Sequence, residues 1–75
     1  MNRQEQMILV ISGIKALKNI TEMTDVTEAT LLKDDLGMDS LDIVELQMWV
    51  EENSKIIVGD PTGPVITIKD ILDLF

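Results

Sequence analysis

The 75-residue chain contains no cysteine, no histidine and no tyrosine. Without cysteine it has neither disulfides nor a thiol nucleophile, and without histidine it lacks the side chain that most often acts as a general base near pH 7. The usual cysteine and histidine ligands of zinc are missing for the same reason. We therefore expect a protein that is not an enzyme and that holds no metal.

Aromatic side chains and long apolar runs are scarce as well. Trp49 and Phe75 are the only aromatic residues, so a core must be built from the aliphatic side chains that dominate the 45% hydrophobic fraction. No apolar run approaches the ~20 residues that span a bilayer, and the start of the chain does not resemble a secretory signal. We expect a single domain over residues 1–75, a monomer, a cytoplasmic location and no membrane partner.

Basic residues are few and acidic residues are concentrated in one part of the chain. The net charge is −8, and residues 19–54 hold ten of the 14 acids but a single base, Lys33. Such a block repels nucleic acid, so we expect no nucleic-acid partner. It attracts proteins that carry basic patches, although the charge could also serve solubility alone.

Hydrophobic periodicity predicts three helical segments. The first covers residues 4–18, with an apolar face and Gly13 inside it, and Asn19 is placed to end it. The second covers residues 41–53 and the third residues 67–75, where Thr67 and Asp70 have the spacing of a capping box. Residues 20–39 are predicted to form a long loop, which in a compact domain is usually functional. Two prolines and two glycines between 59 and 64 forbid a long helix there.

The second predicted helix has two different faces. At 100° per residue, Ile43, Leu46 and Val50 share one face, which is expected to lie in the core, with Trp49 at its edge. A second stripe faces away from the core and mixes apolar and acidic side chains: Leu41, Glu45, Met48 and Glu52, flanked by Asp42 and Val44. Such a stripe suits a partner-binding surface, although a solvated face with scattered apolar residues would give the same sequence pattern.

The segment from Asp34 to Asp42 is the strongest candidate for chemistry. An EF-hand is excluded because apolar residues occupy the positions that should hold calcium ligands. Gly37 permits a tight turn, and Asp39 or Ser40 would cap the helix that follows. A phosphate esterified to Ser40 would lie beside free backbone N–H groups at the positive end of the helix dipole. From composition alone, Ser40 as a simple cap or a phosphorylation site remains an alternative.

The run Asp35-Leu36-Gly37-Met38-Asp39-Ser40-Leu41-Asp42-Ile43-Val44-Glu45-Leu46 resembles the prosthetic-group attachment motif of acyl carrier proteins. The similarity extends to the order of elements and the length of nearly the whole chain. It implies an all-α fold, a small bundle of three to four helices. The run of prolines and glycines implies that the third helix of the family is shortened or replaced by a turn.

The resemblance also implies a function and a site. Ser40 matches the serine that accepts 4′-phosphopantetheine from coenzyme A, and Asp39 and Leu41 match its neighbours. The arm would carry acyl groups as thioesters and present them to enzymes of fatty acid or related acyl-chain biosynthesis. The implied partners are a phosphopantetheinyl transferase and acyl-transferring and chain-elongating enzymes with basic docking patches. The implied partner-binding residues are Asp42, Glu45, Met48 and Glu52.

Two further features depart from the family pattern. Ser54 stands where an apolar aromatic is usual, so Ile56 or Ile57 is expected to compensate, and Trp49 stands where a small residue is usual and is expected to narrow any acyl pocket. The implied acyl shelter comprises Leu32, Leu36, Ile43, Leu46 and Val50. Two alternatives to the function stay open: a dedicated carrier of polyketide or aminoacyl intermediates, and an acidic interaction module without a prosthetic group.

Overall fold

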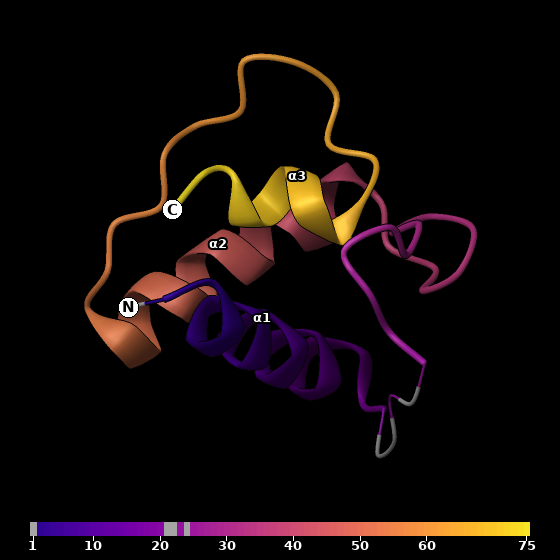
Figure 1. The fold of residues 1–75 in the computed structure, drawn as a ribbon, viewed down its shortest axis with the longest axis horizontal. Helices are drawn as coiled ribbons and strands as arrows, with labels where there is room; N and C mark the ends of the chain where they lie inside the picture. The colour runs from indigo at the N-terminus through magenta and orange to yellow at the C-terminus, as the bar shows by residue number, and fades with distance from the viewer. Residues whose placement is uncertain (1, 21–22, 24) are drawn as a thin grey trace.

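The described residues contain three α-helices: α1 (Arg3–Lys18), α2 (Ser40–Ser54) and α3 (Ile68–Leu72) (Figure 1). The structure is a computed structural model, and it describes residues 2–20, 23 and 25–75. α1 packs against both α2 and α3. The predicted all-α class is confirmed, and residues 55–66 form an extended connection in place of a further helix.

Local sequence signals define α1. The Asn2 side chain accepts a hydrogen bond from the Glu5 amide at 2.8 Å and starts the helix. Asn19 adopts a left-handed conformation with φ 55°, and its amide donates to the Lys15 carbonyl to end the helix. Both bounds lie within one residue of the prediction.

The core is aliphatic, as the lack of aromatic residues requires. Val10 and Ile14 of α1 are completely buried, and Leu46 and Val50 of α2 are 1% exposed. The core is completed by buried residues from the loops and α3: Leu32, Met38, Val58, Ile68, Ile71 and Leu72. The core face predicted for α2 is therefore confirmed, although Ile43 is only half-buried.

The predicted loop 20–39 connects α1 to α2, and three of its residues, Thr21, Glu22 and Thr24, lie outside the described residues. Its second half is fixed to the segment that precedes α3. Leu31 and Thr67 form an antiparallel bridge, in which the Leu32 amide donates to the Ile66 carbonyl at 2.9 Å. This link holds the loop before α2 beside the connection before α3.

α3 begins as predicted but is shorter than predicted. Thr67 and Asp70 form a capping box. The helix ends at Leu72 rather than continuing to Phe75, because the amides of Leu74 and Phe75 donate to carbonyls three residues back and tighten the chain into turns.

The apolar core contact that Ser54 cannot make is supplied by a residue that the sequence did not indicate. Val58 is 5% exposed and joins the core, and its amide donates to Glu51 Oε2 at 3.1 Å. Ile57 is 85% exposed and Ile56 is half-buried, so the expectation is wrong for Ile57. In an extended segment alternate side chains face opposite ways, and this register directs Val58 inward.

Candidate functional site: the start of α2 and the adjoining pocket

A tight turn delivers the chain to the start of α2. The Gly37 amide donates to the Lys33 carbonyl at 3.0 Å, and the Met38 amide donates to the Leu32 carbonyl at 2.9 Å. Gly37 has φ 66°, a conformation that costs glycine little and that most other residues avoid. Because Leu32 and Met38 are both buried, the turn is anchored at both ends and leaves the next two residues at the surface.

Asp39 and Asp42 fix the first turn of α2. Asp39 is the N-cap, and its Oδ1 accepts from the Asp42 amide at 3.0 Å. In return Asp42 Oδ2 accepts from the Asp39 amide at 3.2 Å, which completes a capping box. Of the two predicted caps, Asp39 has the role, and Ser40 is the first residue of the helix.

The Ser40 side chain is consequently free for chemistry. Ser40 is exposed, and its hydroxyl makes no hydrogen bond within residues 2–20, 23 and 25–75. The same described part of the chain offers no acceptor to the backbone amides of Ser40 and Leu41. An exposed hydroxyl therefore lies beside two unpaired N–H donors at the positive end of a helix.

Asp42 also joins α2 to α1. Lys18 Nζ, in the last turn of α1, lies 3.2 Å from Asp42 Oδ2. The backbone hydrogen bond from Asp39, together with the bond from Lys18, holds the pKa of the Asp42 carboxyl below its ordinary value. Asp42 is therefore a carboxylate that already has partners, whereas Glu45 and Glu52 have none among the residues that the structure describes.

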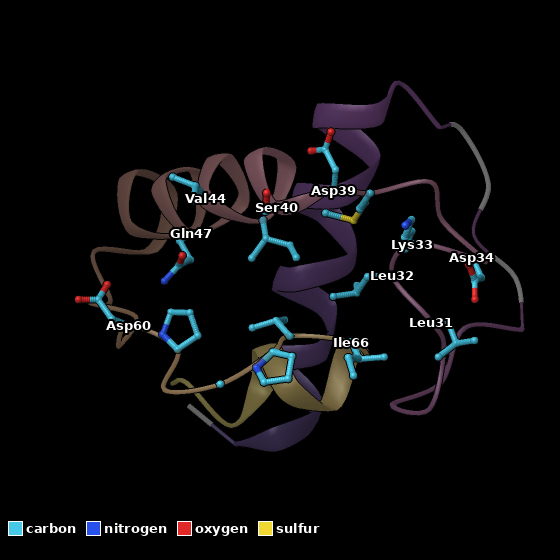
Figure 2. Close-up of a pocket in the computed structure, with 16 residues that line it drawn as sticks. Leu31, Leu32, Lys33, Asp34, Asp39, Ser40, Val44, Gln47, Asp60 and Ile66 are labelled. Carbon is cyan, nitrogen blue, oxygen red and sulfur yellow. The ribbon is translucent and has the colours of Figure 1, made fainter.

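An open pocket of about 860 Å³ adjoins Ser40 (Figure 2). Its lining comes from three segments: the loop before α2, the first two turns of α2, and residues 60–66. The apolar part of the lining includes Leu32, Met38, Ile43, Val44 and Val65, and the polar part includes Lys33, Asp34, Gln47 and Asp60. The volume lies within the range that is typical of small-molecule sites.

The wall opposite α2 is held in place by hydrogen bonds at both ends. Gln47 Nε2 donates to the Gly59 carbonyl at 3.1 Å, and the Gly59 amide donates to the Leu74 carbonyl at 2.8 Å. At the other end the Ile66 amide donates to Asp70 Oδ2 at 2.9 Å. The segment that replaces a helix thus frames the pocket between two fixed points.

The structure brings only some of the predicted residues together at this pocket. Asp39 and Ser40 line it, as do Leu32 and Ile43 of the implied acyl shelter, whereas Leu36, Leu46 and Val50 do not. Gln47 was not anticipated, although it lies seven residues after Ser40 on the same helical face, a spacing that could have identified it. The wall at residues 60–66 had no comparable signal, because turn residues specify no direction.

Trp49 does not narrow this pocket. Its ring lies on the α1 side of α2, where a Cβ built at Gly13 would lie 2.8 Å from Trp49 Cε3. The indole lines a second, smaller hollow together with Ile8 and Leu9. The expected narrowing is therefore wrong, since position 49 faces a different side of the helix from Ser40.

The second predicted stripe of α2 is exposed. Leu41 is 64% exposed, Met48 55% and Val44 50%, and Glu45 and Glu52 lie at the surface beside them. None of the predicted partner-binding residues Asp42, Glu45, Met48 and Glu52 lines the pocket. The start of α2 is therefore where an apolar and acidic surface meets a pocket, with Ser40 at the pocket and Leu41 on the stripe.

Two other kinds of site are absent from the described part of the chain. None of its helices combines the length and the apolar character that crossing a lipid bilayer requires. None of its clusters of acidic side chains has the arrangement of a metal site.

Two curated proteins are similar to this chain over much of its length. An acyl carrier protein of Onion yellows phytoplasma is 42% identical over 68 residues, which cover 85% of this chain and 90% of that protein. An acyl carrier protein of Syntrophobacter fumaroxidans is 45% identical over 49 residues, which cover 64% of this chain and 60% of that protein. No family model and no solved structure matches the chain.

The all-α fold and the similarity across nearly the whole of a curated relative together establish the class of protein. The chain belongs to the acyl carrier protein family, and it has the role of a carrier.

Proposed function

We propose that Ser40 carries 4′-phosphopantetheine and that the chain presents acyl groups, held on that arm, to the enzymes of fatty acid or related acyl-chain biosynthesis. The observation that supports this most strongly is the free, exposed Ser40 hydroxyl at the first residue of α2. In this proposal the chain is a carrier rather than a catalyst. The chain acts as a monomer in the cytoplasm.

Attachment requires a phosphopantetheinyl transferase. Ser40 Oγ attacks the phosphorus of coenzyme A that bears the pantetheine, a new oxygen–phosphorus bond forms, and the bond to the nucleotide phosphate breaks. The adenosine 3′,5′-bisphosphate leaves, and a base on the transferase takes the hydroxyl proton. Ser40 fits this step because its oxygen is exposed and is not engaged within the described chain.

The residues around Ser40 are suited to hold the attached phosphate. The free amides of Ser40 and Leu41 lie where they can donate to it, and Asp39 holds that turn of α2 in place through the Asp42 amide. The bound arm supplies a terminal thiol, which forms thioesters. The pocket beside Ser40 can then cover part of an acyl chain with side chains such as Leu32 and Ile43.

Partner enzymes would dock on the exposed stripe of α2. Glu45, Glu52 and the flanking Asp42 attract basic patches and raise association rates, while Leu41 and Met48 provide a small apolar contact. Brief docking suits a carrier that visits several enzymes, since the tether already supplies a high effective concentration of the carried group.

Incubation with coenzyme A and a promiscuous pantetheinyl transferase tests the proposal directly. The wild-type chain should gain the mass of one arm, and Ser40→Ala should gain none. Ser54→Ala is the matched control, because Ser54 is the other serine of α2 and should not affect loading. Loading that survives Ser40→Ala, or no loading where a known carrier is loaded, would refute the proposal.

The cargo is tested separately from the attachment. A polyketide or aminoacyl carrier remains the alternative, because the pocket lining includes polar side chains such as Gln47 and Asp60 as well as apolar ones. Loading by a malonyl transferase would support fatty acid or related synthesis. Loading by an adenylating enzyme, and not by a malonyl transferase, would favour the dedicated carrier.

A further inference from the structure

We propose that Lys33 is the positioning residue for the phosphate on Ser40: its ammonium pairs with the phosphodiester and directs the arm along the pocket. The inference rests on the proposed function, since it concerns the group attached to Ser40. It adds a residue outside the attachment motif and outside α2.

The turn before α2 places Lys33 on the lining of the pocket that Ser40 also lines. The Lys33 carbonyl accepts from the Gly37 amide at 3.0 Å, so the chain folds back and brings residue 33 next to the residues that lead into the helix. Lys33 and Ser40 line the same pocket, Lys33 from the loop and Ser40 from the start of α2 (Figure 2). A flexible four-carbon side chain at this position can follow a phosphate at the pocket rim.

Lys33 is also available for a new partner. Arg3, Lys18 and Lys69 each form an ion pair with a carboxylate, whereas Lys33 forms none within residues 2–20, 23 and 25–75. Lys55 is likewise without an ion pair in that part of the chain, but it does not line the pocket. Lys33 therefore combines an ammonium without an ion pair in the described chain with a place on the lining of the pocket that Ser40 also lines.

Most of the carboxylates near Lys33 in the sequence already accept hydrogen bonds from backbone amides, which leaves them less available to pair with its ammonium. Asp35 Oδ2 accepts from the Leu31 amide at 2.9 Å, and Asp39 and Asp42 are bound to each other's amides. Asp34 lines the pocket and is the one neighbour in sequence whose carboxylate has no hydrogen bond within the described chain.

A phosphodiester on Ser40 adds negative charge to the most acidic part of the chain. Lys33 is the only base between residues 19 and 54, and Lys18, which reaches the first turn of α2, is already paired with Asp42, so Lys33 is the lysine at the pocket that is left to offset that charge. A charge-assisted hydrogen bond from the ammonium would fix the phosphate at the pocket side of α2 rather than at the stripe side. The pairing is expected to weaken with salt, because Lys33 is exposed.

The test compares the unloaded and loaded forms of four chains: wild type, Lys33→Ala, Lys33→Arg and Lys55→Ala. Lys55→Ala is the matched control because it removes the same charge from an exposed, unpaired lysine away from the pocket. At low salt, loading should lower the melting temperature of Lys33→Ala by about 2–5 °C more than that of the wild type or Lys55→Ala. Lys33→Arg should behave like the wild type.

The phosphorus NMR signal of the loaded chain provides a second readout that does not depend on stability. Its chemical shift should move in Lys33→Ala and should stay at the wild-type value in Lys55→Ala, and the difference should vanish at high salt. Equal behaviour of the two alanine variants in both measurements would overturn the role of Lys33 while leaving the attachment to Ser40 intact. Failure of the wild-type chain to gain the arm would overturn both proposals.

Discussion

Gly13 of α1 lies directly against the indole of Trp49 on α2. A Cβ at position 13 would lie 2.8 Å from Trp49 Cε3 and 2.6 Å from Leu46 Cδ1, closer than carbon atoms approach one another. Glycine in the middle of a helix costs about 1 kcal/mol relative to alanine. The close approach of the two helices explains why glycine is nevertheless found there.

This relationship predicts that Gly13→Ala destabilises the fold although it improves helix propensity. Overpacking costs about 1–3 kcal/mol, so we expect a net loss of about 1 kcal/mol in the free energy of unfolding, measured by urea titration. Ser12→Ala, at the exposed neighbouring position, should be neutral or slightly stabilising. In a Trp49→Ala background the loss caused by Gly13→Ala should shrink or reverse, and an undiminished loss would contradict the packing argument.

The capping box of α3 makes stability depend on pH. The amides of Thr67 and Ile66 donate to Asp70 and hold the pKa of its carboxyl below the ordinary value, so the folded state favours the ionised form. Asp70 therefore stabilises the fold above its unfolded pKa, and this contribution is lost as the pH falls through the lower, folded pKa.

We accordingly expect Asp70→Asn to be less stable than the wild type at pH 7 and to approach it as the pH is lowered through the acid range, as measured by urea titration at each pH. Glu52→Gln is the control, since the Glu52 carboxylate has no hydrogen bond in the described part of the chain and should give a small difference throughout. A deficit of Asp70→Asn that is the same at pH 3 and pH 7 would exclude this role of the carboxylate.

The exposed stripe of α2 should matter for partners and not for folding. Glu45→Lys/Glu52→Lys changes two exposed residues, so its free energy of unfolding should stay within about 1 kcal/mol of the wild type. As the loaded form it should raise the KM of a partner enzyme more than tenfold. Glu5→Lys, an exposed reversal on α1, is the control and should leave the KM unchanged.

The same variants separate the carrier from an interaction module without a prosthetic group. In a host that depends on this chain, the carrier account predicts that Ser40→Ala and the double reversal both abolish complementation. Full complementation by Ser40→Ala, together with failure of the double reversal, would favour the interaction module.

Self-repulsion within residues 19–54 should make stability depend on salt. Raising sodium chloride from ~0.01 M to ~1 M shortens the screening length from about 30 Å to about 3 Å, so the melting temperature should rise. Glu45→Gln/Glu52→Gln removes two of the charges and should show a smaller rise. A melting temperature that does not respond to salt would mean that the carboxylates are already compensated in the fold.

The sequence predicted the features that depend on local chemistry. Asp39 as a cap, Gly37 in a tight turn and the Thr67 capping box each follow from side-chain hydrogen bonding or backbone freedom within a few residues. The exposed serine follows from the same local signals, because Met38 anchors the turn and Asp39 takes the capping role.

Features that depend on distant segments could not be predicted in this way. The inward direction of Val58 depends on its register against Glu51, and Trp49 faces α1 because Gly13 leaves room for the indole. The pocket wall at residues 60–66 depends on the pairing of Leu31 with Thr67. Each of these relationships joins residues from different parts of the chain, and periodicity within one segment carries no information about them.

The most direct test of the central claim is the intact mass of the chain purified from its native host, followed by peptide mapping. The account predicts the mass of one phosphopantetheine arm, with or without an acyl group, on the peptide that contains Ser40. An unmodified chain from cells whose other carriers are loaded, or an arm on any residue other than Ser40, would contradict it.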